Sequence, residues 1–511
     1  MPKQLSLKEY AQASREADVY QAAIRTPLVE APRLSAKLET QILLKREDTQ
    51  PVFSFKVRGA ANAIFSASID AIAKGVICSS AGNHAQGVAL AAANRGVPAH
   101  IVMPKTAAQI KIDAVEELGG TVTLAGQTFD ECQAHAAQLA KEKGMLFIHP
   151  FDDPLVIAGQ GTIGVEIIEE NPDVGAVYIP IGGGGLAAGI ASYIRSTKPG
   201  VKLVGVEPED TASMTAAFDN GTPVTLDQIG IFADGVAVSR VGDETYRLCQ
   251  EALDEIITVN TDEICAAIQL IYEDTRTVVE PAGAIAVAGI AKQKSQDKLS
   301  GGPIAAIVCG ANMNFDRLRH VTERSAIGQG TEALFSVTIP ERKGSFLNLI
   351  NYLVDYNVTE FNYRMSERDN ANVFLGVDLN RNGEVSSSAE IGAHLDSAGF
   401  DNQDLTNSEV AKLHIRHLAA GSGSAEDERL FRFMFPERKG ALRNFLSAIG
   451  TEWNISLFHY RNHGSDYGRV LCGIQVPPES ASELMSHLND LGYSYTDETD
   501  DPTYKLFLSN S

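Results

Sequence analysis

Residues 75–96, GVICSSAGNHAQGVALAAANRG, contain the pattern that decides the fold. A short β-rich run (75–80) leads directly into an Ala-rich helical stretch (84–96). Strand, helix and strand at this spacing predict βαβ crossovers and a buried, mainly parallel sheet, with ligands at the carboxyl ends of the strands. The alternation continues with β-rich runs at 99–104, 121–126, 176–181, 202–207 and 303–310, and with helical stretches that include 111–120 and 129–144.

Length and charge limit the classes of protein to which the chain can belong. At 511 residues it is too long for a single core and should form two or more domains. Its formal net charge of −22 leaves no basic excess to neutralise phosphates, which argues against nucleic acid and membrane surfaces as partners. We therefore expect small molecules or other copies of the chain.

Cysteine usage and the N-terminal residues predict a cytoplasmic protein without a bound metal. The six cysteines are scattered, with no CxxC pair and no histidine in metal-ligand spacing. Residues 1–25 contain no apolar segment of a secretory signal. The longest uncharged run, 176–194, is interrupted by Pro180 and four glycines, so we expect a strand, turn and helix there rather than a membrane helix.

An internal repeat occupies the C-terminal third. VTIPERKGSFLNLINYL (337–353) is echoed by FMFPERKGALRNFLSAIG (433–450), and FNYR (361–364) by FHYR (458–461). Each copy predicts a ferredoxin-like α+β module. The two copies can pair their sheets side by side, within one chain or between chains.

We therefore predict three domains. The first, residues 1–325, contains the alternating strands and helices, and the two repeat modules follow at 333–405 and 429–502. The Gly-Ser segment 419–427 is expected to be a flexible join.

A lysine in apolar surroundings is the first candidate for chemistry. PVFSFKVRGA (51–60) places Lys56 between Phe53, Phe55 and Val57. Such surroundings lower the pKa of a lysine and make its amine a usable nucleophile. The alternative is a helix N-terminal lysine whose stem lies on apolar surface with its charged head in water.

Two segments predict anion sites at helix N-termini. The small residues of SSAGNHAQG (79–87) follow a strand and expose backbone N–H groups suited to a carboxylate, with Asn83 adding an amide. A simple Asn-cap turn is the alternative. The run GGGGL (182–186), between a strand and a helix, can close on a phosphate.

The glycine run by itself does not identify the cofactor. Gly182, Gly184 and Ala187 also match the looser dinucleotide pattern, and Glu207 lies where a ribose-binding acid belongs. A nicotinamide-linked dehydrogenase therefore stays open at this point.

Taken together, the candidates favour pyridoxal phosphate and an amino-acid substrate. The lysine would bind the cofactor aldehyde, the glycines its phosphate, and the Asn83 segment the substrate carboxylate. Cys309, at the end of a late strand, would be a soft polar group near the same sheet edge, although a buried structural cysteine is the alternative. A dehydrogenase would need neither Lys56 nor Asn83.

Five stretches resemble, in order and spacing, the fold-type II (tryptophan synthase β-like) pyridoxal-phosphate enzymes. With two C-terminal modules that look like ACT domains, residues 20–505 resemble the family of biosynthetic threonine deaminases (threonine ammonia-lyases). The stretches are PVFSFKVRGA (51–60), SSAGNHAQG (79–87), GGGGL (182–186), EPAGA (280–284) and CGANMNF (309–315).

The resemblance implies a role for each motif. Lys56 would bind the cofactor covalently and then act as the base, with Phe55 beside the ring. Cys309 stands where many family members carry serine, facing the pyridine nitrogen. The other implied ligands are Asn83 for the phenolic oxygen, Gly182, Gly183, Gly184, Gly185 and Leu186 for the phosphate, and Ser80, Ala81, Gly82, Asn83 and His84 for the substrate carboxylate.

It also implies a reaction and its regulation. L-threonine would be converted to 2-oxobutanoate and ammonia, and L-serine to pyruvate, in a cytoplasmic homotetramer that serves isoleucine biosynthesis. Isoleucine would inhibit the enzyme, and valine would oppose this inhibition. The repeat singles out six residues as candidates for binding the effector: Phe361, Tyr363, Arg364, Phe458, Tyr460 and Arg461. The alternative is that the aromatic residues belong to the module core and the arginines to its solvated rim.

Other functions stay open from the sequence. Serine racemase or dehydratase, threonine synthase and cysteine synthase share the fold-type II motifs. A nicotinamide-linked dehydrogenase and a non-enzymatic amino-acid sensor belong to different classes of protein.

Overall fold

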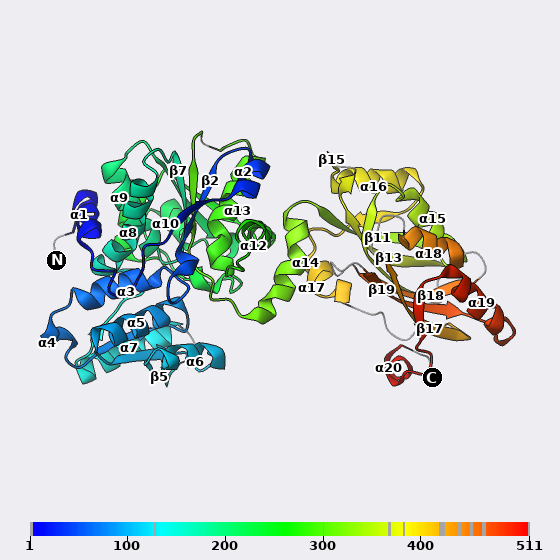
Figure 1. Cartoon of the computed structure of the whole chain (residues 1–511), viewed down its shortest axis with the longest axis horizontal. Helices are drawn as coiled ribbons and strands as arrows, with labels where there is room; N and C mark the ends of the chain where they lie inside the picture. Colours follow the sequence, from blue (N-terminus) through cyan, green and yellow to red (C-terminus); the bar gives the residue numbers. More distant parts are fainter. Residues whose placement is uncertain are drawn as a thin grey trace. The chain divides into compact units, whose positions relative to one another are not determined.

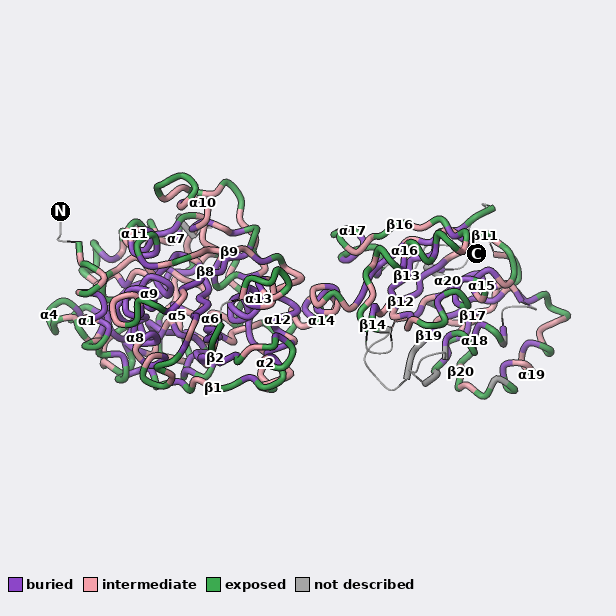
Figure 2. Tube along the Cα trace, turned by 90° about the horizontal axis from the view of Figure 1, so that it is seen from above, coloured by how far each residue is buried: buried purple, intermediate pink, exposed green. Residues whose placement is uncertain are grey.

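The computed structural model describes residues 4–126, 129–299, 301–365, 369–381, 384–417, 425–436, 441–449, 453–461 and 467–508. The chain forms two compact units, Met1–Ser325 and Ala326–Ser511, each with its own hydrophobic core (Figures 1 and 2). No helix within these ranges combines the length and apolar character needed to cross a membrane. The same ranges contain no group of three or more His, Cys, Asp or Glu side chains placed to hold a metal ion.

The first unit is built on two sheets. The larger sheet has the order β1-β2-β10-β7-β8-β9, and all its neighbouring strands are parallel except the pair β1 and β2, which is antiparallel. The smaller sheet, β5-β4-β3-β6, is parallel throughout. This confirms the predicted α/β class with parallel sheets. The strands are β1 (Leu28–Glu30), β2 (Ile42–Arg46), β3 (Val76–Ser79), β4 (Ala99–Met103), β5 (Thr121–Leu124), β6 (Leu146–Phe147), β7 (Ala176–Pro180), β8 (Lys202–Pro208), β9 (Glu255–Val259) and β10 (Ile304–Val308).

Helices pack against both sheets (Figure 1). α5 (Asn83–Arg95) and α7 (Phe129–Lys143) contact the smaller sheet, and α9 (Gly185–Thr197) and α13 (Pro281–Ser295) the larger. The uncharged run 176–194 is thus β7, a glycine turn and α9, as predicted. The other segments are α1 (Leu7–Glu16), α2 (Pro32–Leu38), η1 (Glu47–Thr49), α3 (Lys56–Phe65), α4 (Ile69–Ile72), α6 (Gln109–Glu117), α8 (Pro154–Glu170), η2 (Glu209–Thr211), α10 (Ser213–Asn220), η3 (Asp234–Val236), α11 (Asp243–Ala252), α12 (Thr261–Thr275), η4 (Phe315–Arg317) and α14 (Leu318–Gly328).

The second unit is built on one antiparallel sheet with the order β16-β11-β13-β12-β18-β19-β17-β20. Its strands are β11 (Glu332–Pro340), β12 (Asn357–Arg364), β13 (Asn370–Asp378), β16 (Asn402–Asp404), β17 (Glu428–Pro436), β18 (Asn454–Arg461), β19 (Tyr467–Gln475) and β20 (Ser494–Asp497), beside a separate pair, β14 (Asn380–Arg381) and β15 (Glu384–Val385). Its helices are α15 (Ser345–Tyr352), α16 (Ser388–Ser397), α17 (Glu409–Leu413), η5 (Ile415–His417), α18 (Ala441–Ile449), η6 (Pro478–Ser480), α19 (Ala481–Leu491) and α20 (Pro502–Phe507).

The two copies of the repeat pair side by side within the chain. β11, α15, β12, β13, α16 and β16 form the first copy, and β17, α18, β18, β19, α19 and β20 repeat that order. The copies meet at β12 and β18, where Phe361 lies opposite Tyr460 and Tyr363 opposite Phe458. Residues 437–440 of the second Pro-Glu-Arg-Lys-Gly and 419–424 of the predicted join lie outside the described residues.

Candidate active site

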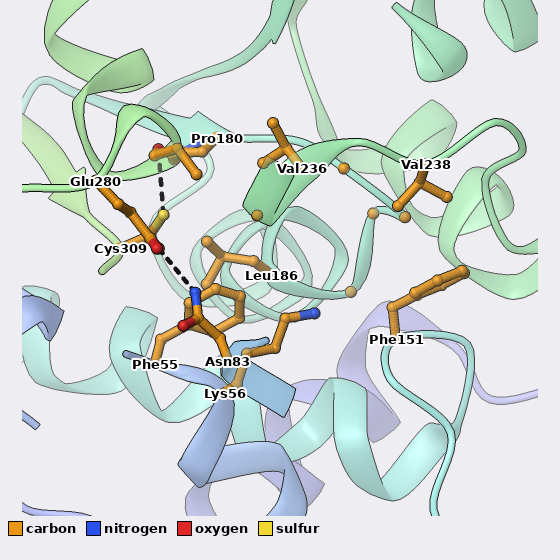
Figure 3. A pocket seen from close by; sticks show the side chains of 16 residues that line it. Phe55, Lys56, Asn83, Phe151, Pro180, Leu186, Val236, Val238, Glu280 and Cys309 are labelled. Carbon is orange, nitrogen blue, oxygen red and sulfur yellow. Dashed lines mark hydrogen bonds between the residues drawn. The ribbon is translucent and has the colours of Figure 1, made fainter. Parts of the chain in front are cut away.

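Lys56 is the first residue of α3 and points into a pocket of the first unit (Figure 3). The segment before it is held against the end of β10, because Ser54 forms a β-bridge with Gly310 and the Phe55 N–H donates to the Cys309 carbonyl (3.2 Å). The lysine therefore starts its helix beside the carboxyl end of a parallel strand, where this fold places ligands.

The amine of Lys56 is desolvated. Its Nζ donates to the Pro150 carbonyl (3.1 Å) and lies 5.3 Å from the centroid of the Phe55 ring. Burial lowers the pKa of Lys56 to about 8, although the nearby Cys309 and Glu280 act in the opposite direction. An uncharged amine is therefore accessible just above neutral pH, as a nucleophile or proton acceptor requires.

The glycine loop Gly182–Gly185 lines the same pocket between β7 and α9. Gly184 has φ 93°, a left-handed value that glycine adopts without strain. A Cβ at Gly183 would lie 2.4 Å from the ring of Phe151, so a larger residue does not fit. Because α9 starts without a side-chain cap, its first N–H groups are available to a phosphate.

The start of α5 is a second helix N-terminus without a side-chain cap. Its N-cap residue is Gly82, where a Cβ would meet no atom within 4 Å. The buried His84 donates from Nε2 to the Ile148 carbonyl (3.1 Å), which leaves Nδ1 as an acceptor without a partner. Burial lowers the pKa of His84 to about 3, so the ring is uncharged. Backbone N–H groups, not this side chain, are therefore the donors for a carboxylate here.

Asn83 lies in the middle of a chain of side-chain hydrogen bonds. Its Nδ2 donates to Glu280 Oε1 (2.7 Å), and its Oδ1 accepts from Asn312 Nδ2 (2.7 Å). Asn312 Nδ2 also donates to the Val52 carbonyl (2.8 Å). Glu280 is buried, and Figure 3 shows its bond to Asn83 at the edge of the pocket.

Cys309 follows β10 and lines the pocket. Its Sγ donates to the Ala282 carbonyl (3.2 Å). Burial raises the pKa of this thiol well above its ordinary value, so it remains a neutral hydrogen-bonding group.

The structure brings the predicted cofactor residues into one pocket. Phe55, Lys56, Asn83, the run Gly182–Leu186 and Cys309 all line it. Of the residues predicted for the substrate carboxylate, Asn83 lines the pocket, His84 is buried, and the half-buried Ser80, Ala81 and Gly82 precede α5.

Several pocket residues have no role in the sequence-based prediction. Glu280 lies in a quoted motif, and an acid directly before the helix-starting Pro281 could have indicated it. Ala282 lies in the same motif, and no comparable local signal marks the other five, which reach the pocket from β7, η3 and loops far along the chain. The additional lining residues are Phe151, Pro180, Gly235, Val236, Val238, Glu280 and Ala282.

Glu207, the acid on which the dehydrogenase alternative depended, is occupied elsewhere. Its carboxylate accepts from the backbone N–H groups of Met214 and Thr215 (2.8 Å each) and from the Thr215 hydroxyl (2.7 Å). It therefore caps the start of α10 and is fully buried, so it does not present a free carboxylate to a ribose.

The effector candidates lie along β12 and β18. Phe361 and Phe458 are buried, with ring centroids 5.4 Å apart, so both belong to the core of the second unit. The Tyr363 hydroxyl donates to Glu341 (2.5 Å).

Arg364 is not solvated. It forms an ion pair with Glu428 of the other copy and donates to the Leu508 carbonyl (2.5 Å), with only 5% of its side chain exposed. Tyr460 is buried and Arg461 half-buried. An effector pocket at these residues stays a prediction.

The first unit matches the family model of the pyridoxal-phosphate dependent enzymes over residues 19–310. The fold and the two uncapped helix starts around Lys56 thus define a pyridoxal-phosphate enzyme, and the pocket fits that cofactor. Residues 323–415 and 420–508 match the C-terminal regulatory domain of threonine dehydratase. The chain belongs to the biosynthetic L-threonine dehydratase family.

Relatives of known name cover nearly the whole chain. The chain is 50% identical over 506 residues to the biosynthetic L-threonine dehydratase of Burkholderia multivorans, covering 98% of this chain and 99% of that protein. It is 49% identical to the Escherichia coli enzyme, covering 98% and 97%.

Solved structures resemble the catalytic body. The processed form of threonine deaminase isoform 2 from Solanum lycopersicum is 48% identical with a TM-score of 0.61, covering 62% of this chain and 93% of that one. Maize serine racemase is 30% identical with a TM-score of 0.59, covering 63% and 97%. The predicted family, fold class and cofactor are confirmed.

Proposed function

We propose that the chain dehydrates and deaminates L-threonine to 2-oxobutanoate and ammonia, and L-serine to pyruvate and ammonia, as the first step of isoleucine biosynthesis. The observation that carries this proposal is the desolvated amine of Lys56 in one pocket with the glycine loop, beside the uncapped start of α5. Such a site suits a phosphate, a carboxylate and a covalent step at an amine.

Each group of the pocket has a task in this reaction. The cofactor, when bound, supplies an electron sink for negative charge at the substrate α-carbon. Lys56 would hold it covalently, the run Gly182–Leu186 would hold its phosphate, and Asn83 would donate to its phenolic oxygen. The backbone N–H groups of Ala81, Asn83 and His84 would orient the substrate carboxylate. Those of Ser80 and Gly82 already donate to the Val102 carbonyl (3.1 Å) and the Ser80 hydroxyl (3.2 Å).

Lys56 then moves the proton. As a free amine, its Nζ has a pKa that burial lowers to about 8. The uncharged form takes the α-proton at Nζ, and the β-hydroxyl leaves the substrate. Phe55 and Phe151, which both line the pocket, help to exclude water during this step.

A product assay tests the proposal. The purified protein with pyridoxal phosphate is incubated with L-threonine or L-serine, and 2-oxo acid, ammonia and D-amino acid are each measured. Equal amounts of 2-oxo acid and ammonia support the proposal. D-serine as the main product would establish a racemase instead. Failure to form either product, with no visible cofactor absorbance, would favour a non-enzymatic amino-acid sensor.

Cys309 provides a smaller prediction about the cofactor ring. We propose that the thiol faces the pyridine nitrogen and leaves it without a proton. Cys309→Ser should keep threonine turnover within about 3-fold, because a hydroxyl also hydrogen-bonds a neutral nitrogen. Cys309→Asp should reduce it at least about 10-fold, because a carboxylate favours the protonated ring. Steady-state kinetics of the two variants test this contact. Equal turnover rates for Cys309→Asp and wild type would show that the pyridine nitrogen does not lie beside Cys309.

We also propose that the second unit senses isoleucine, with valine opposing it, in a cytoplasmic homotetramer. Residues 1–325 are the catalytic domain in this proposal, and 333–405 and 429–502 the regulatory modules. The cores of the first unit lie entirely within Met1–Ser325, so a chain ending at Ser325 should retain its cofactor site.

Truncation at Ser325 should therefore remove inhibition while preserving turnover. Threonine turnover is measured with and without isoleucine in both chains, and cofactor absorbance verifies that the shorter chain is folded. Linkage also requires threonine to weaken isoleucine binding to the full chain. A folded, truncated enzyme that isoleucine inhibits as strongly as the full chain would show that the sensor lies in the first unit.

A further inference from the structure

The orientation of the Asn83 amide is determined by its neighbours. The Val52 carbonyl can only accept, so the Asn312 atom beside it must be the donating nitrogen, Nδ2. That nitrogen also lies 2.7 Å from Asn83, which must present its oxygen there. The amide nitrogen of Asn83 therefore faces Glu280 and the pocket.

Glu280 occupies the N-cap position of α13 but does not cap the helix. No side-chain hydrogen bond is made to the first turn of α13, which starts with Pro281. The carboxyl group instead turns to the pocket, where Oε1 accepts from Asn83 Nδ2 (2.7 Å). Only 3% of Glu280 is exposed, and a Cβ at Gly310 would lie 2.2 Å from Oε1, so the carboxyl group is closely confined.

We propose that Glu280 is a positioning residue that acts through Asn83. By accepting one of the two N–H groups of Asn83 Nδ2, it holds the other at a fixed angle for the phenolic oxygen of the cofactor. This inference rests on the role given to Asn83 in the proposed function. It adds to that role the group that sets the direction of the donor.

The electrostatic surroundings are consistent with a neutral carboxyl group at this position. Burial raises the pKa of Glu280 to about 8, although the hydrogen bond from Asn83 acts to lower it. Asp234 in η3 raises the pKa further, and Lys111 in α6 and Arg317 in η4 lower it. Lys56 and Cys309, which line the same pocket, are the other titratable groups that interact electrostatically with Glu280. A neutral acid accepts through its carbonyl oxygen as a glutamine does, so Glu280→Gln is a close replacement at pH 7.

The test is a double-mutant cycle on cofactor affinity. Apoprotein is prepared for wild type, Asn83→Ala, Glu280→Ala and the double variant, and the Kd for pyridoxal 5'-phosphate is measured at pH 7 with the position of the visible band. Loss of one hydrogen bond should raise the Kd about 10-fold in each single variant. If Glu280 acts through Asn83, the double variant should be no weaker than Asn83→Ala alone.

Two further variants separate positioning from a structural role. Glu280→Gln should restore the wild-type Kd within about 2-fold, because its Oε1 can accept the same bond. Glu207→Gln, at another buried glutamate of this unit whose pKa is raised to about 7, should leave the Kd unchanged. Thermal unfolding shows whether each variant is folded, and Glu280→Met replaces Glu280→Ala if the alanine variant is not.

Three results would overturn the inference: additive effects in the cycle, failure of Glu280→Gln to restore affinity, or an equal loss in Glu207→Gln. None depends on which amino acid is the substrate. A protein that did not deaminate threonine would therefore refute the proposed function and still leave this cycle interpretable.

Discussion

Lys56→Ala is expected to abolish threonine turnover, by at least about 10³-fold, while leaving the fold intact. The substitution removes both the covalent attachment of the cofactor and the base at the substrate α-carbon. The Nζ group makes one hydrogen bond, to the Pro150 carbonyl, so its loss should cost little stability. Turnover and thermal unfolding of the variant, measured beside wild type, check both parts.

Borohydride reduction and peptide mapping of the wild-type protein identify the reactive lysine independently. The reduced cofactor should be found on Lys56. Lys45 is the matched control, since its side chain is fully buried but lies outside the pocket and forms ion pairs with Glu166 and Glu170 (2.8 Å each). Label on Lys45, or on any lysine other than Lys56, would refute the assignment.

Arg58→Met is expected to destabilise the first unit by about 3–5 kcal/mol, because it leaves the buried Glu47 without its ion-pair partner and Glu166 with Lys45 alone. Arg58 is fully buried in α3. It binds Glu47 (2.8 Å) in η1 and Glu166 (2.7 Å) in α8. These bonds join α3, and with it Lys56, to two other segments. Calorimetry should show a lower midpoint for the transition of the first unit.

Arg25→Ala is the matched control for this stability prediction. Arg25 pairs with Glu169 (2.6 Å), but both side chains are about half exposed, at 52% and 53%. An exposed pair contributes about 0–1 kcal/mol, so the variant should unfold close to wild type. Equal destabilisation by Arg25→Ala and Arg58→Met would mean that burial of the Arg58 cluster is not what stabilises the unit.

Patterns between neighbouring residues were sufficient for much of the fold and cofactor site. Alternating β-rich and Ala-rich stretches predicted the parallel sheets, and the glycine run predicted the turn between β7 and α9. The apolar neighbours of Lys56 indicated its desolvation in part, since Phe55 lies beside the amine whereas Phe53 is 56% exposed. Backbone geometry and local polarity are set by residues close in the chain, which is why these features are readable there.

Other parts of the site depend on residues far apart in the chain. Arg58 looks like an ordinary helix residue until Glu47 and Glu166 surround it. Asn83 was a candidate from the sequence, but the direction of its amide follows from Asn312 and Glu280, which the packing of α13 against β10 of the larger sheet brings together. Such contacts leave no periodic signal.

The repeat shows the same division in the second unit. The sequence by itself determined that two similar modules exist, because the echoed segments predict the same strands and helices twice. It left open whether they pair within one chain or between chains, since an edge strand can pair with any strand of suitable register. Only the tertiary structure decided for pairing within the chain, where β12 meets β18 and Arg364 of one copy binds Glu428 of the other.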